Sequence, residues 1–361
     1  RSEQGVRAMA ENMADRKKAI LRAVTDDYIT TAEPVGSRTI ARKYGLGVSS
    51  ATIRNEMADL EDEGYLEQPH ASAGRIPSDK GYRFYVDTLM TGRDLTGLAE
   101  KRIRAEYERR RDEVRALVRT TARMLGEISQ CASVVVGPAV RTAEIRHIQL
   151  VPLSSETVLV LVVTNSGLVE HRVLSIEHAM HPSDLDRISR ILNNRLRGST
   201  LAQMRGAVLR EIQAELSAYA TFLDQMFELL LAAMHSSDEE RVYVDGLMQL
   251  LAQPEFKDVG RARPVLEFLE SDDSVLQALA AAGSRGLGAT VVTIGSENVM
   301  DELQSCSVVS APYGVAGRVV GAVAVVGPTR LDYSMVTALV GYMAEGLSEI
   351  LARLDLCESG E

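Results

Sequence analysis

Three short stretches of helical periodicity, separated by glycine and proline, do most to restrict how the N-terminal part of this chain can fold. In the first, Ile20, Val24 and Tyr28 recur at helical spacing before TTAEPVGS interrupts the pattern. The second is RTIARKY, for which Ser37 is a suitable N-cap and Gly45 a C-terminal stop. A third stretch follows directly after GLGV. Two helices joined by a tight turn that contains glycine form a helix-turn-helix.

The third stretch, VSSATIRNEMADLEDEGY, has its charges sorted along its length. Ser49 is a suitable N-cap, and Gly64 ends the helix. One side is apolar and carries Ile53, Met57 and Leu60. Hydroxyls, one arginine and one asparagine stand at the front, and five carboxylates follow. The two ends of this helix therefore suit different surroundings.

The outward face of this third helix suits DNA only in its first two turns. Arg54 can bond to guanine or to a phosphate, and Asn55 can pair with adenine in the major groove. Ser49, Ser50 and Thr52 add hydroxyls beside the helix N-terminus, whose amides favour a phosphate. DNA would repel the carboxylates behind them, so we expect the helix to enter the groove with its N-terminal end. A solvated acidic face that pairs with Arg54 is the alternative.

The charges of the whole chain are unevenly distributed. The formal net charge is -10, but residues 1–93 hold 14 Lys+Arg and 14 Asp+Glu, so this part is neutral. Residues 34–55 contain no carboxylate, although Arg38, Arg42 and Lys43 lie among them. A local basic face on an acidic protein is compatible with DNA binding through a specific docked element. Arg38 therefore joins the candidate DNA contacts.

A short strand-turn-strand follows the third helix. YLEQPH and GRIP flank ASA, with prolines at the edges, and SDKGYRFYVDTLM resumes a helical pattern from a Ser78 cap. The sequence thus predicts a winged helix-turn-helix. We expect His70, Arg75 and Lys80, in or near the wing, to contact DNA, Arg75 mainly through phosphates. A small helical interaction domain with a hairpin is the alternative.

The remainder of the chain predicts further folded units, because 361 residues allow two or three domains. Residues 98–128 form a charged helical run with an interrupted apolar stripe, which indicates a connector helix. An amphipathic helix is expected from about Asp332. Before it, five buried-type strands are expected in CASVVVG, VYVDG, ATVVTIG, CSVVSAPYG and GRVVGAVAVVG. Together these segments predict an α+β domain.

A segment with its own pattern lies between the first of those strands and the others. IRHIQLVPL, TVLVLVVTN and LVEHRVLSI predict a three-stranded meander, and residues 182–197 predict a helix. Beyond it, apolar residues recur at intervals of three and four, the spacing of paired helices: Leu209, Ile212, Leu216, Tyr219, Leu223, Met226 and Leu230. These residues predict a dimer interface. A helix that packs on its own meander is an equal alternative.

Other kinds of chemistry receive little support from the sequence. Cys131, Cys306 and Cys357 are far apart, so neither a disulfide framework nor a zinc site is predicted, and a reducing cytoplasm is expected. His178 and His181 lack further metal partners, and no nucleophile sits in an activating motif. We therefore expect no metal, no cofactor and no enzyme. Neither a signal peptide nor an apolar run of roughly 20 residues is visible, so no membrane segment is expected.

The sequence EPVGSRTIARKYGLGVSSATIRNEMADLEDEGYLEQPHASAGRIPSDKGYRFYVD closely resembles the N-terminal domain of the heat-inducible transcription repressor HrcA family. LLAQPEFKD, TIGSEN and GPTRLDY resemble later motifs of that family. The resemblance therefore extends from about Arg16 to Leu354.

This resemblance implies three domains. They are a winged helix-turn-helix over residues 16–92, a GAF-like domain from residues 98–143 and 237–356, and an inserted dimerisation domain over residues 144–236. It also implies a repressor that binds, as a homodimer in the cytoplasm, an inverted-repeat operator in double-stranded DNA before chaperone operons. A GroEL-type chaperonin is expected to help keep it active. A metabolite-sensing regulator that uses the GAF-like domain is the alternative.

Overall fold

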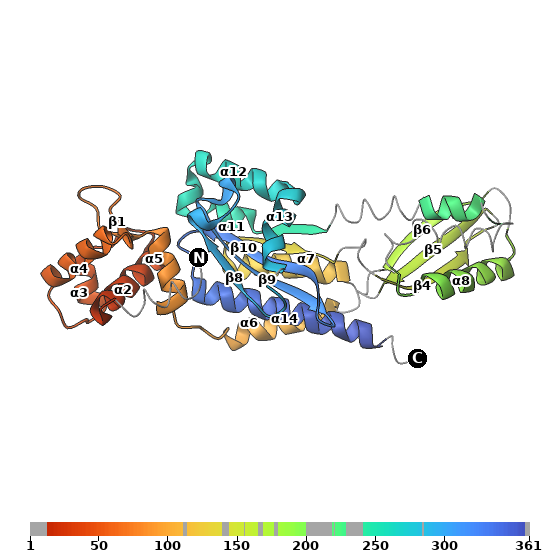
Figure 1. The fold of residues 1–361 in the computed structure, drawn as a ribbon, viewed down its shortest axis with the longest axis horizontal. Coiled ribbons are helices and arrows are strands. Elements are labelled where there is room, and N and C mark those ends of the chain that lie inside the picture. Colours follow the sequence, from red (N-terminus) through yellow and green to blue (C-terminus); the bar gives the residue numbers. More distant parts are fainter. Residues whose placement is uncertain are drawn as a thin grey trace.

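The structure, a computed structural model, describes residues 13–110, 114–138, 144–154, 156–164, 169–176, 180–199, 219, 221–228, 241–283 and 285–357. These residues form a mixed helix-and-sheet fold, as the sequence predicts. Three parts follow one another along the longest axis (Figure 1). They are a helical N-terminal part (residues 13–92), a central five-stranded sheet with its helices, and a distal three-stranded sheet.

The N-terminal part contains the predicted helices and one two-stranded hairpin. Its elements are α2 (Asp15–Thr31), α3 (Ser37–Lys43), α4 (Ser50–Asp62), β1 (Leu66–Glu67), β2 (Ile76–Pro77), α5 (Asp79–Phe84) and the π-helical turn η1 (Tyr85–Leu89). The apolar stripes of the first three helices converge on one core, whose buried side chains include Ile20, Val24, Ile40, Ile53, Met57 and Leu60. Helical spacing in the sequence therefore identified the inward face of each helix.

Two of the three predicted N-caps are confirmed. The Ser49 hydroxyl accepts a hydrogen bond from the Thr52 amide at 3.1 Å, and Ser78 caps α5 in the same way. The prediction for Ser37 is wrong by one position. The helix begins at Ser37 itself, and Gly36, which has no side chain for capping, precedes it.

The central sheet is antiparallel, with strand order β7-β3-β10-β9-β8. Its strands are β3 (Ala132–Val136), β7 (Val242–Asp245), β8 (Val291–Ile294), β9 (Cys306–Val315) and β10 (Arg318–Pro328). All five strands predicted from the sequence are present. Residues from two distant segments of the chain thus complete one sheet.

Helices cover both faces of the central sheet, so the inner strands β3 and β9 are buried on both sides. One face packs against α7 (Val114–Ser129) and α14 (Tyr333–Cys357), with α6 (Gly97–Arg110) outside them. The other face packs against α12 (Val259–Glu270) and α13 (Asp272–Gly283), with α11 (Leu247–Leu251) and the turn η4 (Pro254–Lys257) beside them. Alternate residues of β10, such as Val323 and Ala324, enter the two cores in turn.

The expectation of a connector helix over residues 98–128 is corrected by the structure. Two helices, α6 and α7, occupy this segment and pack against each other. Both belong to the core beneath the central sheet, because Ile103 and Tyr107 of α6 and Leu117 of α7 are buried there. The apolar stripe therefore serves the core.

The stretch Tyr333–Arg353 of α14 is long and apolar enough to cross a bilayer by length and composition alone. In the structure Leu339, Val340 and Met343 are fully buried against the central sheet and α7. A core helix passes the same test of length and composition. The apolar length of α14 is thus explained by packing.

The distal part is the predicted meander, with order β4-β5-β6. It consists of β4 (Ile145–Pro152), β5 (Thr157–Thr164), β6 (Val169–Ser175) and α8 (Pro182–Leu196), with a further helix at residues 221–228. Helix α8 is fixed to the edge of β4, since Asn193 bonds both the amide (2.8 Å) and the carbonyl (2.7 Å) of Ile148. These interactions hold the helix on one face of the sheet.

Candidate nucleic-acid interface

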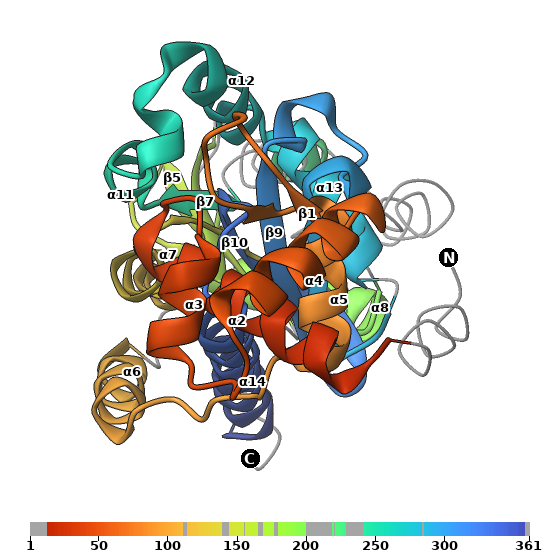
Figure 2. The same ribbon diagram turned by 90° about the vertical axis from the view of Figure 1, so that its left-hand side faces the viewer.

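Helices α3 and α4 pack closely and form the outer end of the N-terminal part, which faces the viewer in Figure 2. The inward side of α4 is fixed by Ile53 and Leu60, which are fully buried. Arg54 and Asn55 therefore lie on its outward side, where both are exposed. Within the part of the chain that the structure describes, neither side chain has a hydrogen-bond or ion-pair partner.

The carboxylates at the back of α4 do have partners, and these come from other elements. Glu56 accepts a hydrogen bond from Nε of Arg16 on α2 at 2.7 Å. Lys17 on the same helix pairs with Asp59 at 3.3 Å and with Glu63 at 2.6 Å. The hydrogen bond to Glu63 raises the pKa of Lys17, which favours the charged form of this side chain.

A further carboxylate of α4, Glu61, pairs with Arg75 of the hairpin at 2.7 Å. Four of the five acids are thus neutralised from behind by α2 and the hairpin. The alternative in which Arg54 pairs with these acids does not occur among the described residues. Arg54 is left as an unpaired cation on the outward side of the first two turns.

The basic residues of α3 add to this surface. Arg38 and Arg42 are exposed, and in the described ranges neither has an acidic partner. Lys43 differs, because it pairs with the buried carboxylate of Asp27 at 2.5 Å. Two arginines of the carboxylate-free segment are therefore free for an anion.

The start of α4 is arranged as the sequence predicts. Ser49 is exposed, and Ser50 and Thr52 are half-buried. The Ser49 hydroxyl lies 3.0 Å from that of Thr52 and also accepts the Thr52 amide. This N-cap leaves the helix terminus at the surface, where its partial positive charge can act on a phosphate.

The hairpin is held firmly at its base. Val35 and Arg75 exchange two backbone hydrogen bonds of 2.9 Å, which tie β2 to the connection between α2 and α3. Gly74 allows this approach, because a Cβ there would lie 2.4 Å from the Val35 carbonyl oxygen. Gln68 spans the tip by bonding the carbonyls of Ala71 and Ala73, and His70 is exposed beside it.

Lys80 lies apart from the other candidates. Its ammonium donates to the Glu63 carbonyl at 2.7 Å and lies 4.1 Å from the centroid of the Tyr65 ring. It therefore sits at the carboxyl end of α4, about 20 Å along the helix from Ser49 at a rise of 1.5 Å per residue. The structure groups Ser49, Ser50, Thr52, Arg54 and Asn55 and leaves Lys80 at the other end.

The predicted dimer residues fall partly within the described residues. Leu209, Ile212, Leu216 and Leu230 lie outside them. Leu223 and Met226 are fully buried within their own chain, in the same core as Val158 and Val160 of β5. Tyr219 bonds to Asp184 of α8. For these three residues the geometry matches the alternative, a helix that packs on its own meander.

The opposite face of the distal sheet is apolar and accessible. Val169 and Val173 of β6 are 52% and 54% exposed. Val173 pairs in register with Leu159 of β5, which in turn pairs with Val151 of β4, so one apolar row crosses the sheet. Exposed apolar side chains gathered on one face are typical of interaction surfaces.

Comparison with known proteins gives one consistent result. A family model described as the HrcA protein C-terminal domain matches residues 115–337. The heat-inducible transcription repressor HrcA of Moorella thermoacetica is 44% identical over 343 residues, which cover 95% of this chain and 99% of that protein. The protein of the same name from Pelotomaculum thermopropionicum is 42% identical over 340 residues, 94% of this chain and 97% of that protein.

A solved structure also matches nearly the whole chain. It is titled as a hypothetical protein at 2.2 Å resolution and is 25% identical, with a TM-score of 0.67. The match covers 95% of this chain and 100% of the other. The arrangement of elements described above therefore recurs in an experimental structure.

Proposed function

The chain belongs to the HrcA family of heat-inducible transcription repressors, and we propose that it represses transcription by binding double-stranded DNA with its N-terminal part. The observation that carries this proposal is the sorted charge of α4. Arg54 and Asn55 are free on the outward side of the first turns, and the acids behind them are paired with α2 and the hairpin. A helix of this kind favours an approach to the groove by its N-terminal end.

In this proposal residues 16–92 act as a winged helix-turn-helix, with α4 as the recognition helix and the β1–β2 hairpin as the wing. Arg38 and the hydroxyls of Ser49, Ser50 and Thr52 bind phosphates, while Arg54 and Asn55 contact bases. His70 at the wing tip supplies a further backbone contact, and Lys80, whose ammonium bonds the Glu63 carbonyl at the carboxyl end of α4, is left out of the proposed interface. Arg75 is shared between Glu61 and a phosphate.

The remaining domains are assigned as the family resemblance implies. Residues 98–143 and 237–356 form a GAF-like domain, which the central five-stranded sheet supports, and residues 144–236 form the inserted domain. We propose that the inserted domain makes a homodimer, so that two recognition helices meet an inverted-repeat operator. Half-sites in such an operator are spaced by whole turns of DNA, about 10 base pairs or a multiple.

Among the described residues, the outer face of the distal sheet is the surface best suited to that homodimer. Its apolar row of Val151, Leu159 and Val173 has no covering helix in the described part of this domain, whereas α8 and residues 221–228 pack on the other face. A twofold dimer needs one self-complementary patch, and an uncharged apolar row meets that need. Leu223 and Met226 then support the sheet from behind.

A GroEL-type chaperonin and a cytoplasmic location complete the proposal. Both come from the family resemblance, and the regulated genes are then chaperone operons. The competing proposal is a regulator that senses a metabolite through the GAF-like domain. In this domain the buried Tyr313 side chain donates a hydrogen bond to the Val136 carbonyl at 2.8 Å, so its hydroxyl is already paired within the protein.

The test is binding of the purified full chain to DNA from upstream of its own operon, measured by fluorescence anisotropy against a shuffled duplex. We expect tighter binding to the upstream DNA by a factor of at least 1,000 at physiological salt, the usual margin of specific over non-specific binding. Equal affinity for the two duplexes would contradict the proposal. A thermal shift with a metabolite pool, in the absence of DNA, would instead favour the metabolite sensor.

A further inference from the structure

Helix α5 belongs to two hydrophobic cores at once. Phe84 packs in the core of the N-terminal part, where its ring meets that of Tyr65 edge to face at 5.4 Å. Tyr82, two residues earlier, is buried in the core beneath the central sheet, 5.9 Å from the ring of Tyr333. Two residues correspond to about 200° around a helix, so the two rings point in opposite directions. Helix α5 therefore connects the two parts by packing in both of their cores.

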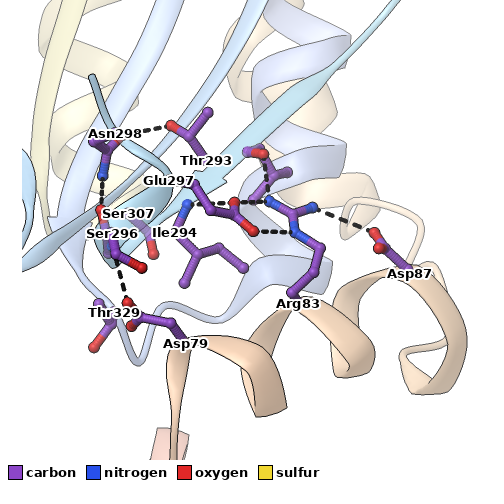
Figure 3. Close-up of polar contacts among 12 residues, drawn as sticks. Asp79, Arg83, Asp87, Thr293, Ile294, Ser296, Glu297, Asn298, Ser307 and Thr329 are labelled. Carbon is purple, nitrogen blue, oxygen red and sulfur yellow. Dashed lines mark hydrogen bonds and ion pairs between the residues drawn. The ribbon is translucent and has the colours of Figure 1, made fainter. Parts of the chain in front are cut away.

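A polar contact locks the same helix to the central sheet (Figure 3). Arg83 donates from Nε to Glu297 at 2.8 Å and from Nη2 to the Val292 carbonyl at 2.7 Å. A second bond from Nη2 to the other carboxylate oxygen of Glu297 makes the pair bidentate. Asp79, one turn earlier, accepts the Ser296 amide at 2.8 Å. We call these residues, Asp79, Arg83, Ser296 and Glu297, the junction contact.

The central sheet is shaped to receive this contact. Glu297 closes the 3-10 turn η5 (Gly295–Glu297) on itself by accepting the Ile294 amide at 3.0 Å. Gly295 has a φ of +51°, and a Cβ at that position would lie 2.3 Å from the Asp79 carboxylate. A glycine is therefore required both by the backbone conformation and by the closeness of α5.

The junction contact adjoins the elements proposed to touch DNA without being part of them. Strand β2 of the wing ends at Pro77, Ser78 caps α5, and Asp79 comes next. On the other side, Arg330 in the turn between β10 and α14 bonds the carbonyl of Ile29 near the end of α2 at 3.3 Å. The wing and α2 are thus both fixed to the central domain.

These contacts bear on how a dimer would read an operator. Linking two DNA-binding modules raises the apparent affinity by roughly 100- to 10,000-fold only when geometry lets both modules bind at once. In space, the distal sheet lies at the opposite end of the molecule from α4 (Figure 1). A dimer made there can fix the distance between two recognition helices only if each N-terminal part is held rigidly on its central sheet.

We propose that Arg83 and Glu297, with Asp79 and Ser296, are positioning residues for operator recognition: they hold the N-terminal part at one orientation and so set the half-site spacing that the dimer accepts. The inference rests on the proposed DNA-binding function. It assigns no base or phosphate contact to these residues. Their loss leaves each recognition helix intact and frees its orientation.

The test compares three duplexes, which are a single half-site, the full inverted repeat, and the repeat with about 5 base pairs inserted at its centre. They are cut from the DNA that the wild-type chain protects. The variants are Arg83→Met and Glu297→Gln in the full-length chain, with Arg83→Lys as the conservative change, because lysine keeps the charge and loses the bidentate geometry. Arg263→Met is the matched control, since Arg263 pairs with Glu267 at 2.7 Å on the exposed side of α12.

We expect Arg83→Met and Glu297→Gln to bind the half-site within about 2-fold of wild type and the full repeat at least about 10-fold more weakly, a partial loss of the gain from linkage. The penalty for the inserted base pairs should shrink in both variants. Arg83→Lys should lie between Arg83→Met and wild type, and Arg263→Met should match wild type throughout. Half-site binding also shows that the N-terminal part of each variant is folded.

Two results would overturn the inference. The first is an equal loss on the half-site and the full repeat, which would place Arg83 or Glu297 in the DNA contact or in folding. The second is an unchanged preference for spacing in both variants. A different result would contradict the proposed function itself: the wild-type chain would bind the repeat and shuffled DNA equally. This control is measured before any variant is made, so the two kinds of failure can be told apart.

Discussion

Lys17, in α2, lies 2.6 Å from Glu63, which follows the end of α4 and is 46 residues later in the sequence. Because Lys17 also pairs with Asp59, a single cation compensates two of the carboxylates at the back of α4. At the N-terminal end of α4 the charge is positive, and within the described residues Arg54 has no acidic partner. The pairing with Lys17 therefore makes the carboxyl end of α4 repel DNA less than its sequence alone indicates.

The first prediction concerns this pairing. Lys17→Met leaves Asp59 and Glu63 uncompensated, and their repulsion from the DNA backbone should weaken operator binding several-fold at low salt. The loss should diminish as salt rises, because exposed charges more than about 8 Å apart are screened at 0.15 M. Lys18→Met is the matched control, as Lys18 pairs, among the residues that the structure describes, only with Asp15, at 3.9 Å. Equal losses for the two lysines at low salt would contradict the role of the pairing.

Arg75 gives the second prediction. In the structure Arg75 pairs with Glu61, so Arg75 can bind a phosphate only if its guanidinium contacts both Glu61 and the phosphate. If Arg75 binds a phosphate, Arg75→Ala should weaken binding to all sequences alike and flatten the slope of log affinity against log salt by about one unit. Glu61→Gln releases Arg75 and should keep the wild-type slope or steepen it. A wild-type slope for Arg75→Ala would assign this residue to the hairpin alone.

The third prediction concerns the distal sheet. Val169→Asp and Val173→Asp each introduce a negative charge. If this face makes the dimer, the same charge on the second subunit lies opposite it across the twofold axis, and the two repel each other. A few kcal/mol of repulsion corresponds to a dissociation constant raised about 100-fold or more. Sedimentation at micromolar concentration should then show monomers. Val299→Asp is the control, because Val299 is 94% exposed on the central domain. Dimers in both distal variants would place the interface elsewhere.

The two buried thiols give the fourth prediction. Burial raises the pKa of Cys131 and of Cys306 to about 12, from an ordinary value of 9.0. The folded state thus favours the protonated thiols, and the stability they contribute is present below pH 9 and lost as the pH rises toward 12. At pH 8 neither thiol should react with a disulfide reagent unless the chain unfolds, as peptide mass mapping would show. Rapid labelling of either in the native chain would contradict their burial.

Much of this fold could be predicted from the sequence because its signals are local. Helical spacing identified Ile53, Met57 and Leu60 as the inward side of α4, and all three are buried. The runs of β-branched residues located all five strands of the central sheet. The caps at Ser49 and Ser78 also follow from local chemistry.

What the sequence did not predict depends on contacts between distant segments. The sequence does not predict that Arg16 and Lys17 pair with carboxylates of α4, because nothing local to α2 indicates a partner 40 or more residues away. The stripe that includes Leu223 and Met226 has the same spacing whether it faces a partner helix or its own sheet. Only packing distinguishes the two, and here both side chains lie against the meander.

The fifth prediction and the most direct test concern the end of α4 that enters the groove. Methylation-interference footprinting of the full chain on its operator should show contacts at guanine N7 in the major groove of two half-sites, about 10 base pairs or a multiple apart. Arg54→Ala and Asn55→Ala should each cost about 1 to 3 kcal/mol on the operator and much less on shuffled DNA. Each should abolish the preference for one base pair per half-site. Interference confined to the minor groove, or equal losses on both DNAs, would contradict the account.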